Sequence, residues 1–329
     1  MALQGSNFPR LVLRHFLVQL ALLSTVRSYH FKELYPNTII KRVAVKSDFR
    51  SWKKNFTAYA PISYSNECAI GECDPDIGTE NFHPKFNELD GTIDRRRMPK
   101  VKNGKKKLYM IENGLPLNPR GRTGLAGRGE LKRWGPNHLV YVMLSRGEKP
   151  REYAVMQTNH ENELPDYPHV FVDNPRESDI PAPILEMLKA NLGAIYSPKY
   201  VERMIKDIEK NNVEFYRGYL TDQRNTDNAW IEMRLIEIND PTYKHIGLID
   251  FTPANNPFNL TWTIFDRTFF HEQISKRMAQ SDTKFSSKFA RRLRAQLLEI
   301  KVGTAGYRFM LFRMGLVITS TVIGAATLG

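Results

Sequence analysis

Several features of common protein classes are scarce or absent in this 329-residue sequence. It has only 2 cysteines, which excludes a scaffold held by several disulfides and a cysteine-rich zinc module. Cys68 and Cys73 lack the histidine or cysteine neighbours that zinc requires, so they could at most pair with each other in an oxidising compartment. No P-loop, Gly-x-Ser-x-Gly or Rossmann fingerprint is present, and the 8 histidines show no metalloprotease spacing.

Acidic residues are outnumbered. The sequence has 48 Lys and Arg against 35 Asp and Glu, a net charge of +13, and basic residues gather at residues 95–107 and 284–313. Such a charge favours an anionic partner. We expect a nucleotide or a membrane surface rather than a nucleic acid. With 41% apolar and 11% aromatic residues, the chain can form a core in one large or two small domains.

The N-terminal segment, residues 1–29, predicts a targeting sequence. It contains no acidic residue, and three arginines accompany an apolar run at residues 16–23 that is short for a membrane span. This pattern favours a mitochondrial presequence. A secretory signal is the alternative, and glycosylation sequons that begin at Asn55 and Asn259 would be usable in that pathway.

The C-terminal residues 309–329 are mostly apolar and just long enough to cross a thin bilayer. We expect a transmembrane tail anchor there. The preceding residues 284–308 predict a basic helix or linker that would meet anionic lipid headgroups. The alternative is a buried terminal helix.

Between the two ends, strand-like and helical patterns alternate without internal repeats, which predicts an α+β fold. The expected strands cover residues 107–111, 138–144, 152–157, 214–220 and 228–238. The expected helices cover residues 184–192, 198–211 and 270–280, with a longer basic helix after residue 286.

The most unusual stretch is residues 121–138, where glycines alternate with Arg122, Arg128 and Arg133. Glycines leave backbone N–H groups accessible, and arginine presents a planar fork that suits phosphate or carboxylate groups. The segment therefore suggests an anion-binding loop. It could also be a glycine-rich connector with solvated arginines.

Motifs at four places in the chain resemble, in the same order, the mitochondrial ADP-ribose pyrophosphatase family of the Nudix superfamily. The same domain forms the ADP-ribose sensor of melastatin-type channels. The resemblance extends over residues 36–280. It is carried by residues 81–91, 111–119, 121–138, and 216–219 with 224–230.

The resemblance implies an N-terminal β-rich lobe at residues 30–145 and a Nudix α/β/α sandwich at residues 146–283, with ADP-ribose between them. Family members cut the pyrophosphate to AMP and ribose 5-phosphate. Their Mg²⁺ ions are held by several glutamates, because divalent ions that polarise a pyrophosphate need a cluster of carboxylates.

The catalytic pattern of the family, G-x5-E-x7-R-E-U-x-E-E-x-G-U, is degenerate here. Ala190 and Asn191 stand where the metal-binding glutamate pair is expected, and residues 254–257 have lost two further acids to asparagine. Glu177 and Glu186 remain as weak catalytic candidates. We expect no resident metal, and Mg²⁺ only if the chain is an active hydrolase.

The positions that contact ADP-ribose in the family match this sequence better than the catalytic positions do. The loop at residues 224–228 could instead be structural, with its side chains satisfying turn backbone. His271 could likewise be an ordinary residue on the surface of a helix. The predicted ligand-binding residues are Asp222, Arg224, His271, Arg122 and Arg128.

Three functional hypotheses follow. The first is a mitochondrial, membrane-anchored Nudix pseudoenzyme that binds ADP-ribose or a related nucleotide as a sensor or scaffold. The second is an active Mg²⁺-dependent ADP-ribose diphosphatase that recruits substitute acids from Asp173, Glu177, Asp179 or Glu186. The third is a structural subunit of a mitochondrial assembly, in which the nucleotide cleft is vestigial and a protein complex is the partner.

Overall fold

The computed structural model describes residues 31–69, 71–98, 107–148, 150–157 and 166–264. From Lys32 onward these residues belong to one compact unit. The helices expected at residues 270–280 and after residue 286, the targeting segment and the C-terminal anchor lie outside the described residues. No helix among the described residues is long and apolar enough to cross a bilayer.

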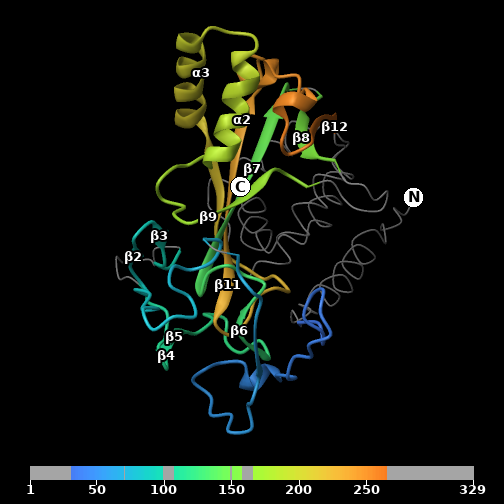
Figure 1. Cartoon of the computed structure of the whole chain (residues 1–329). Coiled ribbons are helices and arrows are strands. Elements are labelled where there is room, and N and C mark those ends of the chain that lie inside the picture. Colours follow the sequence, from blue (N-terminus) through green and yellow to red (C-terminus); the bar gives the residue numbers. More distant parts are fainter. Residues whose placement is uncertain (1–30, 70, 99–106, 149, 158–165, 265–329) are drawn as a thin grey trace, which may run out of the picture. The chain divides into compact units, whose positions relative to one another are not determined.

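A six-stranded mixed sheet is the centre of the described fold (Figure 1). Its two long strands, β7 and β11, run parallel and pair over twelve residues. β10 flanks β11, and β8 and β9 share the other edge of β7. β12 pairs with β8. The bounds are β7 Gly135–Arg146, β8 Glu152–Met156, β9 His169–Val172, β10 Val213–Leu220, β11 Ala229–Asp240 and β12 Leu260–Ile264.

Two helices cover one face of this sheet. α2 (Ala182–Gly193) begins after Pro181, and α3 (Pro198–Asn211) begins with a proline, as is common where the first N–H groups of a helix have no partner. Alternate residues of β7 and β11, including Val140, Val142 and Ile236, pack against both helices in one apolar core.

The described residues before β7 form small strand pairs rather than a second large sheet (Figure 1). The hairpin of β4 and β5 turns at Asn113 and Gly114, which both have positive φ, the geometry that an Asn-Gly hairpin turn requires. The elements of this part are the 3-10 helix η1 Ser47–Phe49 and strands β1 Ile62–Ser65, β2 Leu89–Asp90, β3 Ile93–Asp94, β4 Ile111–Glu112, β5 Leu115–Pro116 and β6 Leu125–Gly129. Two further 3-10 helices, η2 Ile246–Leu248 and η3 Pro253–Asn255, precede β12.

The α+β prediction is confirmed, and so are both helices and four of the five strands that fall on described residues. The strand predicted at residues 107–111 is wrong, because only its last residue enters β4. The cause is local: the backbone N–H and carbonyl of Tyr109 both bond to the side-chain amide of Asn87, at 2.7 and 3.2 Å, instead of to a neighbouring strand.

Candidate functional site

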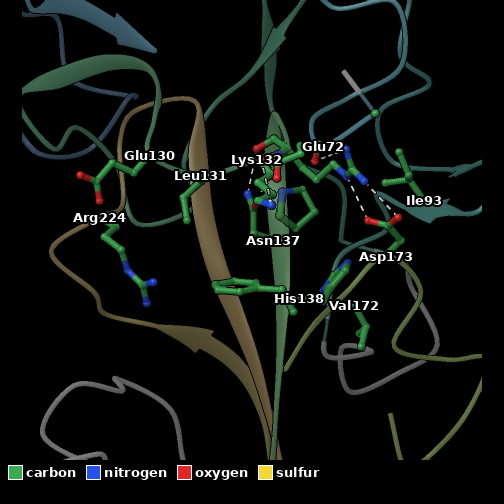
Figure 2. Close-up of a pocket in the computed structure, with 14 residues that line it drawn as sticks. Glu72, Ile93, Glu130, Leu131, Lys132, Asn137, His138, Val172, Asp173 and Arg224 are labelled. Atoms are coloured by element: carbon green, nitrogen blue, oxygen red, sulfur yellow. Dashed lines mark hydrogen bonds and ion pairs between the residues drawn. The ribbon is translucent and has the colours of Figure 1, made fainter. Parts of the chain in front are cut away.

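A cavity of about 500 Å³ lies where the β6–β7 turn, β3, β9 and the β10–β11 loop come together. This volume is typical of small-molecule sites. Figure 2 shows Arg224 and Glu130 at one end, Asp173 and Ile93 at the other, and His138 between them.

At the first end, Arg224 is held in place by its own loop. Asp222 accepts hydrogen bonds from Nε and Nη2 of Arg224, each at 2.9 Å, and from its backbone N–H at 2.8 Å. The hydroxyl of Tyr35 donates to the Arg224 carbonyl at 2.9 Å. Asp222 therefore orients Arg224 and takes only two of its five guanidinium N–H donors.

At the other end, two further cations are paired with carboxylates. Arg133 makes two hydrogen bonds of 3.0 Å to Asp173, and the Lys132 ammonium lies 3.4 Å from Glu72. The cations of the cavity thus come with acidic partners. An anionic ligand would have to share or replace those partners, so we expect moderate and salt-dependent affinity.

The histidine of the cavity is a neutral structural group. His138 is buried, and its Nε2 donates to the carbonyl of Asp94 at 2.5 Å. Burial lowers the pKa of His138 to about 3. At neutral pH its ring is therefore uncharged, which does not suit it as a general acid.

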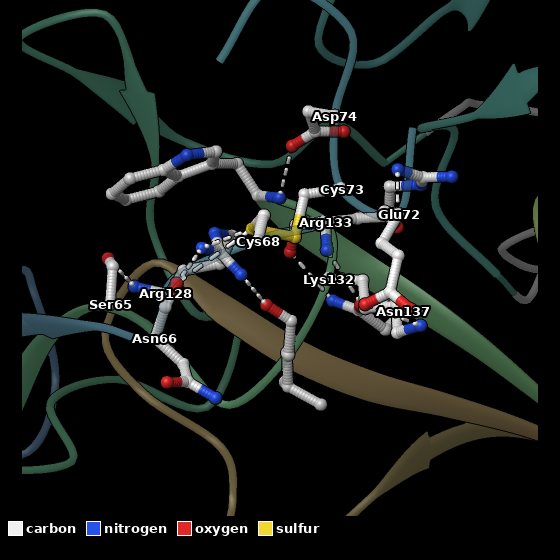
Figure 3. Close-up of a disulfide and its surroundings, with 12 residues drawn as sticks. Ser65, Asn66, Cys68, Glu72, Cys73, Asp74, Arg128, Lys132, Arg133 and Asn137 are labelled. Atoms are coloured by element: carbon white, nitrogen blue, oxygen red, sulfur yellow. Dashed lines mark hydrogen bonds and ion pairs between the residues drawn. A yellow bond between two sulfur atoms is a disulfide. The ribbon is translucent and has the colours of Figure 1, made fainter. Parts of the chain in front are cut away.

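The disulfide between Cys68 and Cys73 closes a short loop that forms part of the cavity wall (Figure 3). Gly71 and Glu72, inside the closed loop, line the cavity. Arg128 also holds the start of this loop in place, since its Nη2 lies 2.6 Å from the Asn66 carbonyl oxygen and 2.9 Å from the Cys68 sulfur. The pairing of the two cysteines that the sequence allows is present.

Arg122 and Arg128, predicted as ligand-binding residues, do not line the cavity. Both are buried. Arg122 donates to the carbonyls of Phe49 and Ser51, each at 2.8 Å, and Arg128 donates to the carbonyl of Leu131. Of the three arginines in this segment, only Arg133 reaches the cavity.

The backbone amides of the glycine-rich segment also have partners inside the protein. The N–H of Gly127 donates to the Asn228 side chain at 3.0 Å, and that of Gly124 to the Tyr59 hydroxyl at 3.0 Å. A Cβ on Gly127 would lie 2.3 Å from the Tyr64 carbonyl oxygen, so glycine is needed for close packing of β6 on β1. The segment joins the N-terminal strands to the sheet.

The loop before β11 is structural in the same way. Asp227 accepts from the backbone and hydroxyl of Thr123, at 2.6 and 2.9 Å, and from the Tyr59 hydroxyl at 2.5 Å. Asn228 donates to the Pro116 carbonyl at 3.2 Å. In this loop Arg224 lines the cavity, whereas Asp227 and Asn228 bind backbone, as the structural interpretation of the loop predicts.

The positions at which the family resemblance would place magnesium ligands include amide groups rather than a cluster of carboxylates among the described residues. Asn191, where the resemblance predicts a metal-binding glutamate, is buried, and its side-chain amide donates to the Asn255 carbonyl at 2.7 Å. Glu177 and Glu186 are both exposed. Among the described residues no three His, Cys, Asp or Glu side chains gather as metal ligands, and the residues present do not fit a Mg²⁺ cluster.

The predicted ligand-binding residues do not include Lys132 or Phe171, which both line the cavity. Lys132 is one basic residue among many, and Phe171 lies in an ordinary apolar strand pattern. His271 lies outside the described residues. Its role stays a prediction.

Comparison with known proteins agrees with this architecture. Residues 45–135 match the NUDT9-like, N-terminal domain family. The mitochondrial ADP-ribose pyrophosphatase of Rattus norvegicus is 28% identical over 252 residues, which cover 69% of each chain. The putative nudix hydrolase 6 of Caenorhabditis elegans is 31% identical over 218 residues, which cover 63% of this chain and 77% of that protein.

A channel is also similar. The transient receptor potential cation channel subfamily M member-like 2 of Nematostella vectensis is 31% identical over 254 residues, and the match spans 69% of this chain but only 16% of the channel. Together with the fold and the cavity, these similarities show that the chain belongs to the ADP-ribose pyrophosphatase-like family of Nudix proteins.

Proposed function

We propose that this chain binds ADP-ribose or a related nucleotide in the cavity and that its hydrolytic activity is lost or strongly reduced, so that it acts as a sensor or scaffold. The observation that carries the proposal is the contrast between two places in the fold. The cavity keeps an oriented arginine at Arg224, whereas Asn191 and Asn255 bind each other where the family holds magnesium.

The binding half rests on charge and shape. Arg224, Lys132 and Arg133 all line the cavity, and a guanidinium held by Asp222 is preorganised to bind a phosphate oxygen. The cavity volume suits a nucleotide rather than a macromolecule.

Replacement of Arg224 by alanine tests this half. We expect the Kd of the full chain for ADP-ribose, measured by calorimetry, to rise at least tenfold. Arg203→Ala is the matched control, because Arg203 is an exposed arginine on α3 that does not line the cavity. Equal affinities of Arg224→Ala and the unmodified chain would contradict the assignment of the site.

The alternative is an active Mg²⁺-dependent diphosphatase, favoured by the name of the rat relative. Two of its substitute acids are already engaged, Asp173 with Arg133 and Asp179 with Arg234 at 2.8 Å. If the enzyme is active through Glu186, Glu186→Gln should abolish AMP formation. An unchanged rate in that variant would exclude this version of the mechanism.

We also propose a mitochondrial location with membrane attachment through residues 309–329. The acid-free N-terminal segment and the mitochondrial rat relative support it. The secretory alternative has support of its own, since Cys68 and Cys73 are paired and Asn55 and Asn259 are exposed. Peptide N-glycosidase treatment of the cell-expressed chain distinguishes them: we expect no mobility shift, and a shift would overturn the mitochondrial location.

A further inference from the structure

One aromatic ring of the cavity is left open to solvent. Phe171 lines the cavity and is 45% exposed. On β9 its neighbours Val170 and Val172 pack against the core under the helices, so Phe171 projects from the opposite side of the strand. A half-exposed phenyl ring in a concave site is apolar surface that a bound planar group would remove from water.

The surroundings of Phe171 on that side are aromatic and charged, since Arg224 and Glu130 lie at this end of the cavity. The guanidinium carbon of Arg224 lies 5.7 Å from the centre of the Phe171 ring. In the strand pairing, Phe171 stands opposite Leu139 and His169 opposite Tyr141, and the His169 and Tyr141 rings are 4.6 Å apart. Phe171 and His169 therefore lie on the same face of β9, and Phe171 is the one beside Arg224.

The far end of the cavity has a different character. There Arg133 and Lys132 pair with Asp173 and Glu72, and among the described lining residues no exposed phenyl ring lies beside these charged side chains. A ligand with one flat apolar part and one charged part would match this division, whereas a sugar phosphate alone would leave Phe171 uncovered.

We propose that Phe171 is the stacking residue for the base of the nucleotide bound in this cavity, with the phosphates between Arg224, which lies beside Phe171, and the cations Lys132 and Arg133. The inference rests on the proposed function and deepens it, because it assigns the selection for a nucleobase to one residue. Stacking on a phenyl ring accepts any base, since every base has a flat π-face. The site should therefore require a base without strictly selecting adenine.

The test compares three probes on the full chain: ADP-ribose, AMP and ribose 5-phosphate. In Phe171→Ala we expect the Kd for ADP-ribose and for AMP to rise about tenfold, while that for ribose 5-phosphate changes less than twofold. Phe171→Trp should keep or strengthen binding, and its indole fluorescence should be quenched by AMP. Tyr200→Ala is the control, because Tyr200 is a half-exposed aromatic residue on α3 outside the cavity.

The outcomes separate this inference from the function on which it rests. If the unmodified chain binds ADP-ribose and Phe171→Ala binds it equally well, the stacking role is refuted and the binding function stands. If ribose 5-phosphate weakens as much as ADP-ribose, Phe171 only maintains the shape of the cavity and the inference is also refuted. If the unmodified chain binds none of the probes, the proposed function itself fails.

Discussion

At the residue scale, Asn191 has a structural role. Its buried amide donates to the carbonyls of Met187, at 2.8 Å, and Asn255, at 2.7 Å. Asn191→Ala should lower the free energy of unfolding by about 1 to 3 kcal/mol, because two hydrogen bonds are lost, one of them buried, and the half-buried Asn255 carbonyl loses its donor. Urea denaturation measures this.

Asn211→Ala is the matched control for Asn191→Ala. Asn211 makes the same type of bond to a carbonyl one turn earlier, that of Asp207 at 2.8 Å, but on the exposed surface. We expect a change within about 0.5 kcal/mol there. Equal losses in both variants would show that burial of the Asn191 amide contributes nothing.

Two buried groups should oppose each other in the pH dependence of stability. Burial raises the pKa of Glu232 to about 7, and burial lowers that of His138 to about 3. Between about pH 4.5 and 6.5, the folded chain keeps a proton on Glu232 that the unfolded chain has lost, while the unfolded chain holds one on His138 that the folded chain lacks. Stability falls with rising pH through Glu232 and rises through His138, so the two slopes nearly cancel.

The variant Glu232→Gln removes one of these slopes. Its free energy of unfolding should rise with pH by roughly 1 kcal/mol from pH 5 to 6, whereas that of the unmodified chain should stay nearly flat. Urea denaturation at the two pH values measures the difference. Parallel profiles for the two proteins would contradict a protonated Glu232.

At the scale of elements, the disulfide loop connects the stability of the fold to the wall of the cavity. The bond closes a short loop whose Gly71 and Glu72 line the cavity. Replacing Cys68 and Cys73 together by serine should cost about 2 kcal/mol of stability. It should also weaken ADP-ribose binding, because the loop with Gly71 and Glu72 would no longer be held as a preorganised wall of the cavity. Binding that is equal in the serine variant and the disulfide form would show that the loop is not part of the site.

Two elements show how much of the fold could be predicted from sequence patterns. α3 was predictable to the residue, since Pro198 marks its start and its apolar spacing is regular. The prediction of an anion-binding loop at residues 121–138 depended on glycines and arginines alone. That pattern cannot show that Asn228, Tyr59 and Asp227, from distant parts of the chain, use the amides, which only the folded arrangement reveals.

At the scale of the whole molecule, the family resemblance supplied more than local patterns could. It pointed to Asp222 and Arg224, and the structure places Arg224 in the cavity with Asp222 as its support. The resemblance could not point to Phe171. The sequence does not tell on which face of the sheet an apolar strand residue lies, and the face of Phe171 becomes clear only from the pairing of β9 with β7.

Membrane attachment is a prediction at this scale. After cell lysis in a buffer without carbonate and centrifugation, we expect the full chain in the membrane pellet and the chain without residues 309–329 in the supernatant. The reason is that residues 309–329 form an apolar stretch of the length that a membrane span requires. The melting temperature should change little. A chain that stays in the pellet after deletion would refute the anchor.

The central claim is that the cavity binds ADP-ribose while hydrolysis is lost or strongly reduced. The most direct measurement is a calorimetric titration of the full chain with ADP-ribose, with and without Mg²⁺. We predict saturable heat with a Kd near the micromolar range, about 8 kcal/mol of binding free energy, and no sustained heat. Continuous Mg²⁺-dependent heat with formation of AMP, or a flat trace in both conditions, would contradict the account.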